Sequence, residues 1–80
     1  LEKNMLFKVF YQETKKRSPK RETTHSLYLE LDTTDVRQGV IQSREIMRDN
    51  TDYHVEFIDA ISDEQAAYER ESEGFNITTF

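Results

Sequence analysis

Apolar and polar residues alternate along three segments of the chain, and alternation with a period of two is typical of β-strands. In residues 5–12, Phe7 and Val9 point to one side, while Leu6 and Phe10 point to the other. Because large apolar groups occur on both sides, this segment is expected to be a central strand that is at least partly covered on both faces.

The second and third predicted strands cover residues 25–32 and 53–59. Leucine at every second position gives the second strand one apolar and one polar face, which indicates one buried face and one face in water. The third strand places three apolar residues on one face: Tyr53, Val55 and Phe57. The polar segment of residues 13–24, with Ser18-Pro19 at its middle, predicts a long hairpin connection between the first two strands.

Two capping signals mark the starts of helices. Asp35 is followed three residues later by Gln38, and Ser62 by Gln65, which is the spacing of a capping box. The first helix is expected to extend to about Asp49. The second is expected to be short and to end near residue 72, before a glycine breaks the pattern.

The first helix carries an apolar stripe that should face the sheet. Its members are Val36, Val40, Ile41, Ile46 and Met47. Gly39 also lies on this stripe, where Gly costs roughly 0.5–1 kcal/mol relative to Ala, so we expect the helix to approach a strand closely there. Asn50 tolerates left-handed backbone and is expected to end the helix.

These elements predict an α+β fold in the order β-β-α-β-α-β, with a mostly antiparallel sheet and the main helix on one face. The first strand is placed at the centre, and a βαβ unit would cross over right-handed. The last strand, at Phe75 and Ile77, is short or else an extended tail. We expect one small domain spanning residues 5–80, with residues 1–4 a remnant of expression or a disordered extension.

The composition narrows the function classes. The 80 residues are 35% hydrophobic and 34% charged, near the lower limit for a chain that folds on its core alone. Because there is no Cys, neither a disulfide framework nor a thiolate metal site can form. Two Gly and one Pro leave no phosphate-binding glycine loop. No apolar run approaches the roughly 18–20 residues of a membrane span, so we expect a cytoplasmic protein with no membrane partner.

Catalytic chemistry finds no favourable arrangement of residues. His25 and Ser26 are neighbours on one strand and therefore point to opposite faces, and His54 lies on the polar side of its own strand. No His or acidic cluster has the spacing of metal ligands, and nothing singles out a carboxylate pair among the acids. We therefore predict no catalytic residue, no metal site, no cofactor and no enzymatic activity of the chain by itself.

Charge is distributed unevenly along the chain. The formal net charge is −5, and residues 49–73 hold nine acids and one base, yet residues 15–21 carry five positive charges. This basic run could be a solvated loop that prevents edge-to-edge aggregation, a protein-docking element, or a nucleic-acid contact that weakens with salt. Exposed aromatic residues are further candidates for interface anchors. The candidate docking residues are Lys15, Lys16, Arg17, Lys20, Arg21, Tyr28 and Phe80.

Three stretches, "FKVFYQETKKRSPKRETTHSLYLEL", "NTDYHVEFI" and "YERESEGFNITTF", resemble the epsilon subunit of RNA polymerase from low-GC Gram-positive bacteria. The resemblance covers residues 5–80 and is weakest in the helix of residues 35–49. It implies a dispensable accessory subunit bound to a core of two alpha, one beta and one beta-prime subunit, on the secondary-channel side. It also implies a fold similar to that of a small phage inhibitor of polymerase, and it transfers no catalytic residue.

The resulting hypothesis is a non-catalytic accessory subunit that binds the RNA polymerase core and modulates or stabilises it. It would have no small-molecule ligand and would meet nucleic acid only through the complex. Two alternatives remain open: a stand-alone regulator that binds nucleic acid through residues 15–21, and a phage-type polymerase inhibitor.

Overall fold

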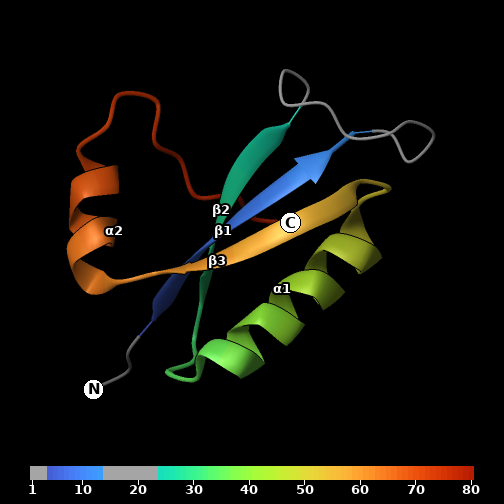
Figure 1. Ribbon diagram of the computed structural model, residues 1–80, viewed down its shortest axis with the longest axis horizontal. Helices are drawn as coiled ribbons and strands as arrows, with labels where there is room; N and C mark the ends of the chain where they lie inside the picture. Colours follow the sequence, from blue (N-terminus) through green and yellow to red (C-terminus); the bar gives the residue numbers. More distant parts are fainter. Residues whose placement is uncertain (1–3, 14–23) are drawn as a thin grey trace.

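The computed structural model describes residues 4–13 and 24–80, and its five named elements follow one another along the chain (Figure 1). They are β1 (Met5–Gln12), β2 (His25–Leu31), α1 (Val36–Asn50), β3 (His54–Ile61) and α2 (Asp63–Arg70). The expected α+β class is confirmed, and each strand or helix begins and ends within a few residues of its predicted bounds.

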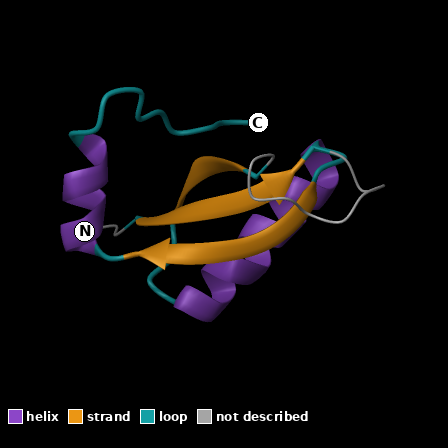
Figure 2. Cartoon of the chain, turned by 45° about the horizontal axis from the view of Figure 1, so that its top comes forward, coloured by secondary structure: helices purple, strands orange, loops and turns teal. Residues whose placement is uncertain are grey.

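The three strands form one sheet in the order β2-β1-β3, with β1 antiparallel to both neighbours. The central position expected for the first strand is therefore confirmed. Because β2 and β3 both oppose β1, they are parallel to each other, and α1 connects them across β1. Helix α1 packs against β1 and β3 on one face of the sheet, whereas the chain after α2 passes over the other face (Figure 2).

The main core lies between α1 and the sheet. Its buried members come from all three strands and the helix: Phe7, Val9, Leu29, Leu31, Met47 and Ile58. Phe7 and Val9 have no exposed surface, as the central strand requires. The ring of Phe7 meets α1 at Gly39, so the close approach expected at this glycine is confirmed.

The buried stripe of α1 differs from the predicted one. Its buried residues are Gly39, Ser43 and Met47, four positions apart, whereas Val36 and Ile41 are about half exposed, at 51% and 48%. The prediction ranked positions by hydrophobicity. Contact between the Phe7 ring and the glycine instead fixes the rotation of the helix, and that rotation turns Val36 and Ile41 towards water.

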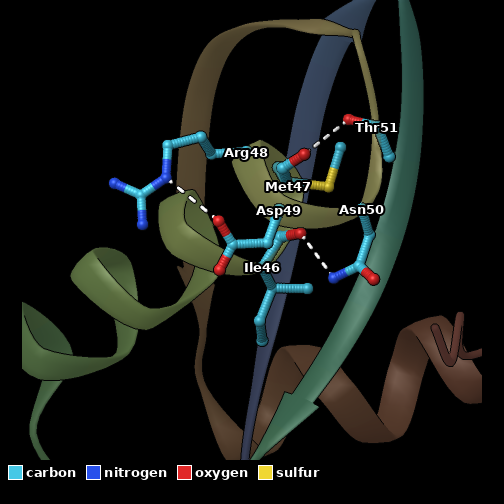
Figure 3. A network of polar contacts seen from close by, with 6 residues as sticks. All are labelled: Ile46, Met47, Arg48, Asp49, Asn50 and Thr51. Carbon is cyan, nitrogen blue, oxygen red and sulfur yellow. Dashed lines mark hydrogen bonds and ion pairs between the residues drawn. The ribbon is translucent and has the colours of Figure 1, made fainter.

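Helix α1 ends by side-chain and backbone capping (Figure 3). Thr51 is extended, with φ −140°, and its Oγ1 donates to the Met47 carbonyl at 2.7 Å. The Asn50 amide donates to the Ile46 carbonyl at 2.8 Å. The helix thus ends at Asn50 as expected, but the expected left-handed backbone at this residue is wrong, because no described residue other than glycine has a positive φ.

Strand β3 contains a register shift that changes which side chains face α1. Phe10 pairs with Phe57, but Tyr11 pairs with Val55, so Glu56 is an extra residue. Such a bulge reverses the alternation on one side of it. Ile58 therefore enters the core, and Phe57, predicted to share a face with Val55, lies on the opposite face.

The predicted last strand is only a single parallel bridge between Ile77 and Tyr28. The Thr78 N–H donates to the Tyr28 carbonyl at 2.9 Å, and Gly74, with φ +86°, allows the chain to turn before this contact. Of the two predictions for this segment, a short strand or an extended tail, the extended tail is therefore confirmed for residues 75–80. They lie along the outer edge of β2.

Candidate docking surface

The sheet face opposite α1 is organised in three rows, each with one residue from β2, one from β1 and one from β3. The strand registers define the rows from the α2 end of the sheet to the hairpin end: Glu30–Leu6–Ile61, Tyr28–Lys8–Asp59 and Ser26–Phe10–Phe57. Because side chains alternate across a strand, these residues share one face. The three rows differ in how far the rest of the chain covers them.

The two apolar residues of the first row are covered. Leu6 is 3% exposed and Ile61 is 6% exposed, although neither belongs to the core on the α1 side. Glu30 accepts a hydrogen bond from the Arg70 guanidinium in the last turn of α2, at 2.9 Å. This ion pair, about half exposed, ties α2 to the outer strand.

The second row is connected to α2 and the tail through Tyr28. The Tyr28 hydroxyl donates to the Glu69 carboxylate at 2.7 Å, and the Lys8 ammonium lies 3.9 Å from the same carboxylate. The Tyr28 ring also packs against Phe75, with centroids 4.7 Å apart. This second polar connection holds α2 on the sheet, even though α2 itself has no buried residue.

The Tyr28–Glu69 contact changes the acidity of both groups. Burial, and then the hydrogen bond to Glu69, raise the pKa of Tyr28 above its ordinary value. The hydrogen bond from Tyr28, followed by that from Gln65, lowers the pKa of Glu69. Both shifts favour the protonated phenol beside the ionised carboxylate.

The third row is largely open. The rings of Phe10 and Phe57 stack with centroids 6.0 Å apart and an interplanar angle of 29°. Phe10 is partly buried, whereas Phe57 is 55% exposed. The Lys8 ammonium lies over the Phe10 ring, 5.3 Å from its centroid. Ser26, at the other end of the row, is also exposed. We call Phe10 and Phe57 the aromatic pair.

Acidic residues border the aromatic pair. Asp59 lies two residues after Phe57 on the same face of β3 and is exposed. Glu56, at the bulge, accepts hydrogen bonds from Gln12 and Thr24 at 3.3 and 3.1 Å. Within the described part of the chain, the four ion pairs leave Asp59 without a basic partner.

The residues predicted for docking are placed differently from one another. Tyr28 is engaged by Glu69 and Phe75, whereas Phe80 is 56% exposed at the end of the tail. Both line an open depression of about 450 Å³ that also includes the stacked rings of Tyr11 and Tyr53. The five basic residues of the run at 15–21 lie outside the described residues, so a docking role for them stays a prediction.

Phe57, Phe10 and Asp59 were not among the predicted docking residues. Strict alternation assigned Phe57 to the same face as Tyr53 and Val55, and the bulge reverses that assignment. The sequence signal that could have indicated it is Ile58, because the strand carries two adjacent large apolar residues and only one of them can face α1.

Within residues 4–13 and 24–80, no three His, Asp or Glu side chains are close enough to share a metal ion. The His25 Nε2 lies 2.8 Å from the Glu13 carboxylate, and both side chains are about half exposed. No helix in the described part of the chain combines the length and the hydropathy needed to cross a bilayer.

Comparison with known proteins identifies the family. The family model described as RNA polymerase epsilon subunit matches residues 6–79. A relative from Lactococcus lactis subsp. lactis, named DNA-directed RNA polymerase subunit epsilon, is 57% identical over 76 residues. Relatives with the same name from Streptococcus gordonii and Streptococcus sanguinis are 51% and 50% identical. Each of these alignments covers 95% of this chain and 100% of the relative. Because the family model spans both helices and all but the first residue of the sheet and the last residue of the tail, this chain belongs to the RNA polymerase epsilon subunit family.

Proposed function

We propose that this chain is an accessory subunit of DNA-directed RNA polymerase, which binds the core of alpha, beta and beta-prime subunits and supplies no catalytic group of its own. The observation that carries this proposal is the match to epsilon subunits over their entire length. Because the alignments cover 100% of each relative, they include whatever surface those proteins use for docking. The place of action would be the cytoplasm, where bacterial transcription occurs.

The mechanism would be surface docking that modulates or stabilises the core. The described residues offer a suitable surface, since one sheet face carries an open aromatic row and a border of acids. Charge of one sign at a docking surface orients association and excludes wrong partners more than it adds affinity. A small acidic domain would therefore select a basic region on a larger assembly.

The alternative of a stand-alone nucleic-acid-binding regulator receives no support from the family match. A net charge of −5 also opposes attraction to phosphates. The phage-type inhibitor would use the same partner with the opposite effect, so a measurement of transcription is needed to separate it from an accessory subunit.

The test uses purified chain, polymerase core and duplex DNA. Binding to the core and to the DNA would be measured separately at about 50 and 200 mM salt, a range over which phosphate contacts weaken steeply. We expect saturable one-to-one binding to the core and negligible binding to DNA. Salt-sensitive DNA binding without core binding would reject the proposal, and loss of transcript output on saturation of the core would favour the inhibitor.

A further inference from the structure

We propose that the aromatic pair, Phe10 and Phe57, is the anchor by which this chain docks on the polymerase core, and that its counterpart is an apolar side chain flanked by Lys or Arg. This inference rests on the proposed function, because it names the surface through which the accessory subunit would bind. It differs from the sequence-based candidates, which placed docking at Tyr28, Phe80 and residues 15–21.

The bulge at Glu56 is the first observation that supports this surface. The strand pairs regularly with β1 from Ile61 back to Phe57, and the shift follows immediately, between the partners of Phe10 and Tyr11. Without the extra residue, Val55 and Phe57 would share the face covered by α1. Bulges commonly re-aim a side chain near functional sites, and this bulge directs a large aromatic group away from the core.

The coverage of the sheet face is the second observation. Helix α2 and the tail contact the first two rows through Arg70, Glu69 and Phe75, and the tail reaches the third row at Ser26, its member on β2. Phe57 remains 55% exposed beside a second ring. Stacked rings on strands are rigid, so they bury area on binding with little loss of side-chain entropy.

The border of the aromatic pair defines the chemistry of the occupant. Asp59 is exposed and has no ion-pair partner among the described residues, and Glu56, at the bulge, directly precedes Phe57 on the same strand. Among the described residues, Lys8 is the basic residue that contacts these rings, and Glu69 already pairs with it. Among the described residues, the uncompensated charge next to the pair is therefore negative, and a basic border on the partner would complement it.

The same charges make a second copy of this chain an unsuitable occupant. Two copies joined through this face would bring Asp59 and its neighbours together, and like charges at close range are destabilising. The border therefore favours a different, basic partner, and the free chain is expected to sediment as a monomer at low salt.

The decisive experiment compares two phenylalanines of equal exposure, Phe57 at 55% and Phe80 at 56%. Binding of wild type, Phe57→Ala and Phe80→Ala to the polymerase core would be measured by titration, and folding would be checked by circular dichroism. We expect Phe57→Ala to weaken binding at least about tenfold, as for a central aromatic anchor. Phe80→Ala is expected to change it by less than about twofold. Asp59→Asn is expected to weaken binding at low salt and to flatten its salt dependence.

A second variant keeps the inference testable if Phe57→Ala unfolds. Ser26 is exposed at the other end of the third row, so Ser26→Arg adds bulk and positive charge without disturbing the core. We expect it to weaken core binding at least about tenfold.

Each outcome separates this inference from the proposed function. Unchanged binding of Ser26→Arg, or a loss with Phe80→Ala that Phe57→Ala does not share, would overturn the anchor and leave the accessory role intact. If the free chain forms a dimer and Phe57→Ala abolishes that dimer, the partner of this face is a second copy, and the proposed basic partner is wrong. Failure of the wild-type chain to bind the core would remove both proposals.

Discussion

The ring of Phe7 occupies the space that a side chain on Gly39 would need: a Cβ built on this glycine would lie 1.9 Å from the Phe7 Cζ. Phe7 is fully buried in the central strand and cannot swing aside. We therefore expect Gly39→Ala to lower the free energy of unfolding. Overpacking costs about 1–3 kcal/mol, which outweighs the roughly 0.5–1 kcal/mol that Ala gains over Gly in a helix.

Urea unfolding would measure this effect, with two control variants. Phe7→Leu combined with Gly39→Ala should cost less than the sum of the two single changes, because the smaller side chain makes room for the new methyl group. Gly74→Ala should lower the free energy of unfolding by only about 1–2 kcal/mol, the cost of a left-handed backbone for a residue with a side chain. Nothing lies within 4 Å of its Cβ position, so only its φ of +86° opposes the substitution. A Gly39→Ala variant as stable as wild type would refute the contact.

Ser43 is a polar residue in the middle of the buried stripe. It has no exposed surface, and its hydroxyl has no hydrogen-bond partner among the described residues. A buried polar group without a partner costs about 1–3 kcal/mol, and Ala is the better helix former. We therefore expect Ser43→Ala to raise the free energy of unfolding by about 1 kcal/mol.

A matched control for Ser43 is the N-cap serine of α2. The Ser62 hydroxyl accepts the Gln65 N–H at 3.2 Å, so Ser62→Ala should lower stability, by about 0.5–2 kcal/mol. Thermal unfolding of the two variants would show shifts of opposite sign. A lower melting temperature for Ser43→Ala would mean that its hydroxyl has a partner after all.

The hydrogen bond from Tyr28 is the largest cause of the lowered pKa of Glu69. We expect Tyr28→Phe, which removes only the hydroxyl, to raise that pKa towards its ordinary value of 4.5. Carbon-detected NMR titration of the Glu69 carboxyl would measure the change. Tyr68→Phe, on the exposed side of α2, should leave the pKa unchanged, and an equal effect of both variants would contradict the assignment.

The same pair predicts how stability depends on pH. Because the folded-state pKa of Glu69 is lowered, its contribution to stability is present above about pH 4.5 and is lost as the pH falls through the folded value. Because the pKa of Tyr28 is raised, its contribution is present below about pH 10 and is lost as the pH rises through its folded value. Tyr28→Phe should reduce the acid-side loss, as measured by urea unfolding at a series of pH values.

Thr51 joins the end of α1 to the start of β3. Its Oγ1 donates to the Met47 carbonyl at 2.7 Å and accepts the Tyr53 N–H at 3.2 Å. Thr51→Val keeps the shape and removes both bonds, so we expect a loss of about 1–2 kcal/mol in urea unfolding. Thr34→Val, at an exposed position, should be near neutral, and a similar loss there would point to a general cost of valine.

The fold could be predicted from the sequence where local patterns determine it. The alternation in residues 5–12 and the capping residues Asp35 and Ser62 gave the central strand and both helix starts. The rotation of α1 could not be predicted, because it depends on which strand residue meets Gly39. A hydrophobic pattern ranks Val36 above Ser43, whereas packing against the Phe7 ring buries the serine and exposes the valine.

The candidate site was predicted less well. Tyr28 was chosen because it lies on a polar face. Glu69 and Phe75, which contact it, are both more than forty residues away in sequence, so no local pattern indicates these contacts. Phe57 was missed because the bulge arises from the pairing of β3 with β1, and the alternation within β3 alone does not indicate it. In both cases long-range contacts determined which aromatic group stays open.

The central place of β1 has a consequence for synthesis on the ribosome. This strand is synthesised early, but one of its two partners, β3, is synthesised much later, since Phe7 pairs with Ala60. At roughly 5–20 residues per second, the apolar strand spends several seconds with one edge unpaired. A nascent chain that stalls or is cut within α1 would expose that edge to strands of other chains. Such a fragment would aggregate and would not form a smaller, functional subunit.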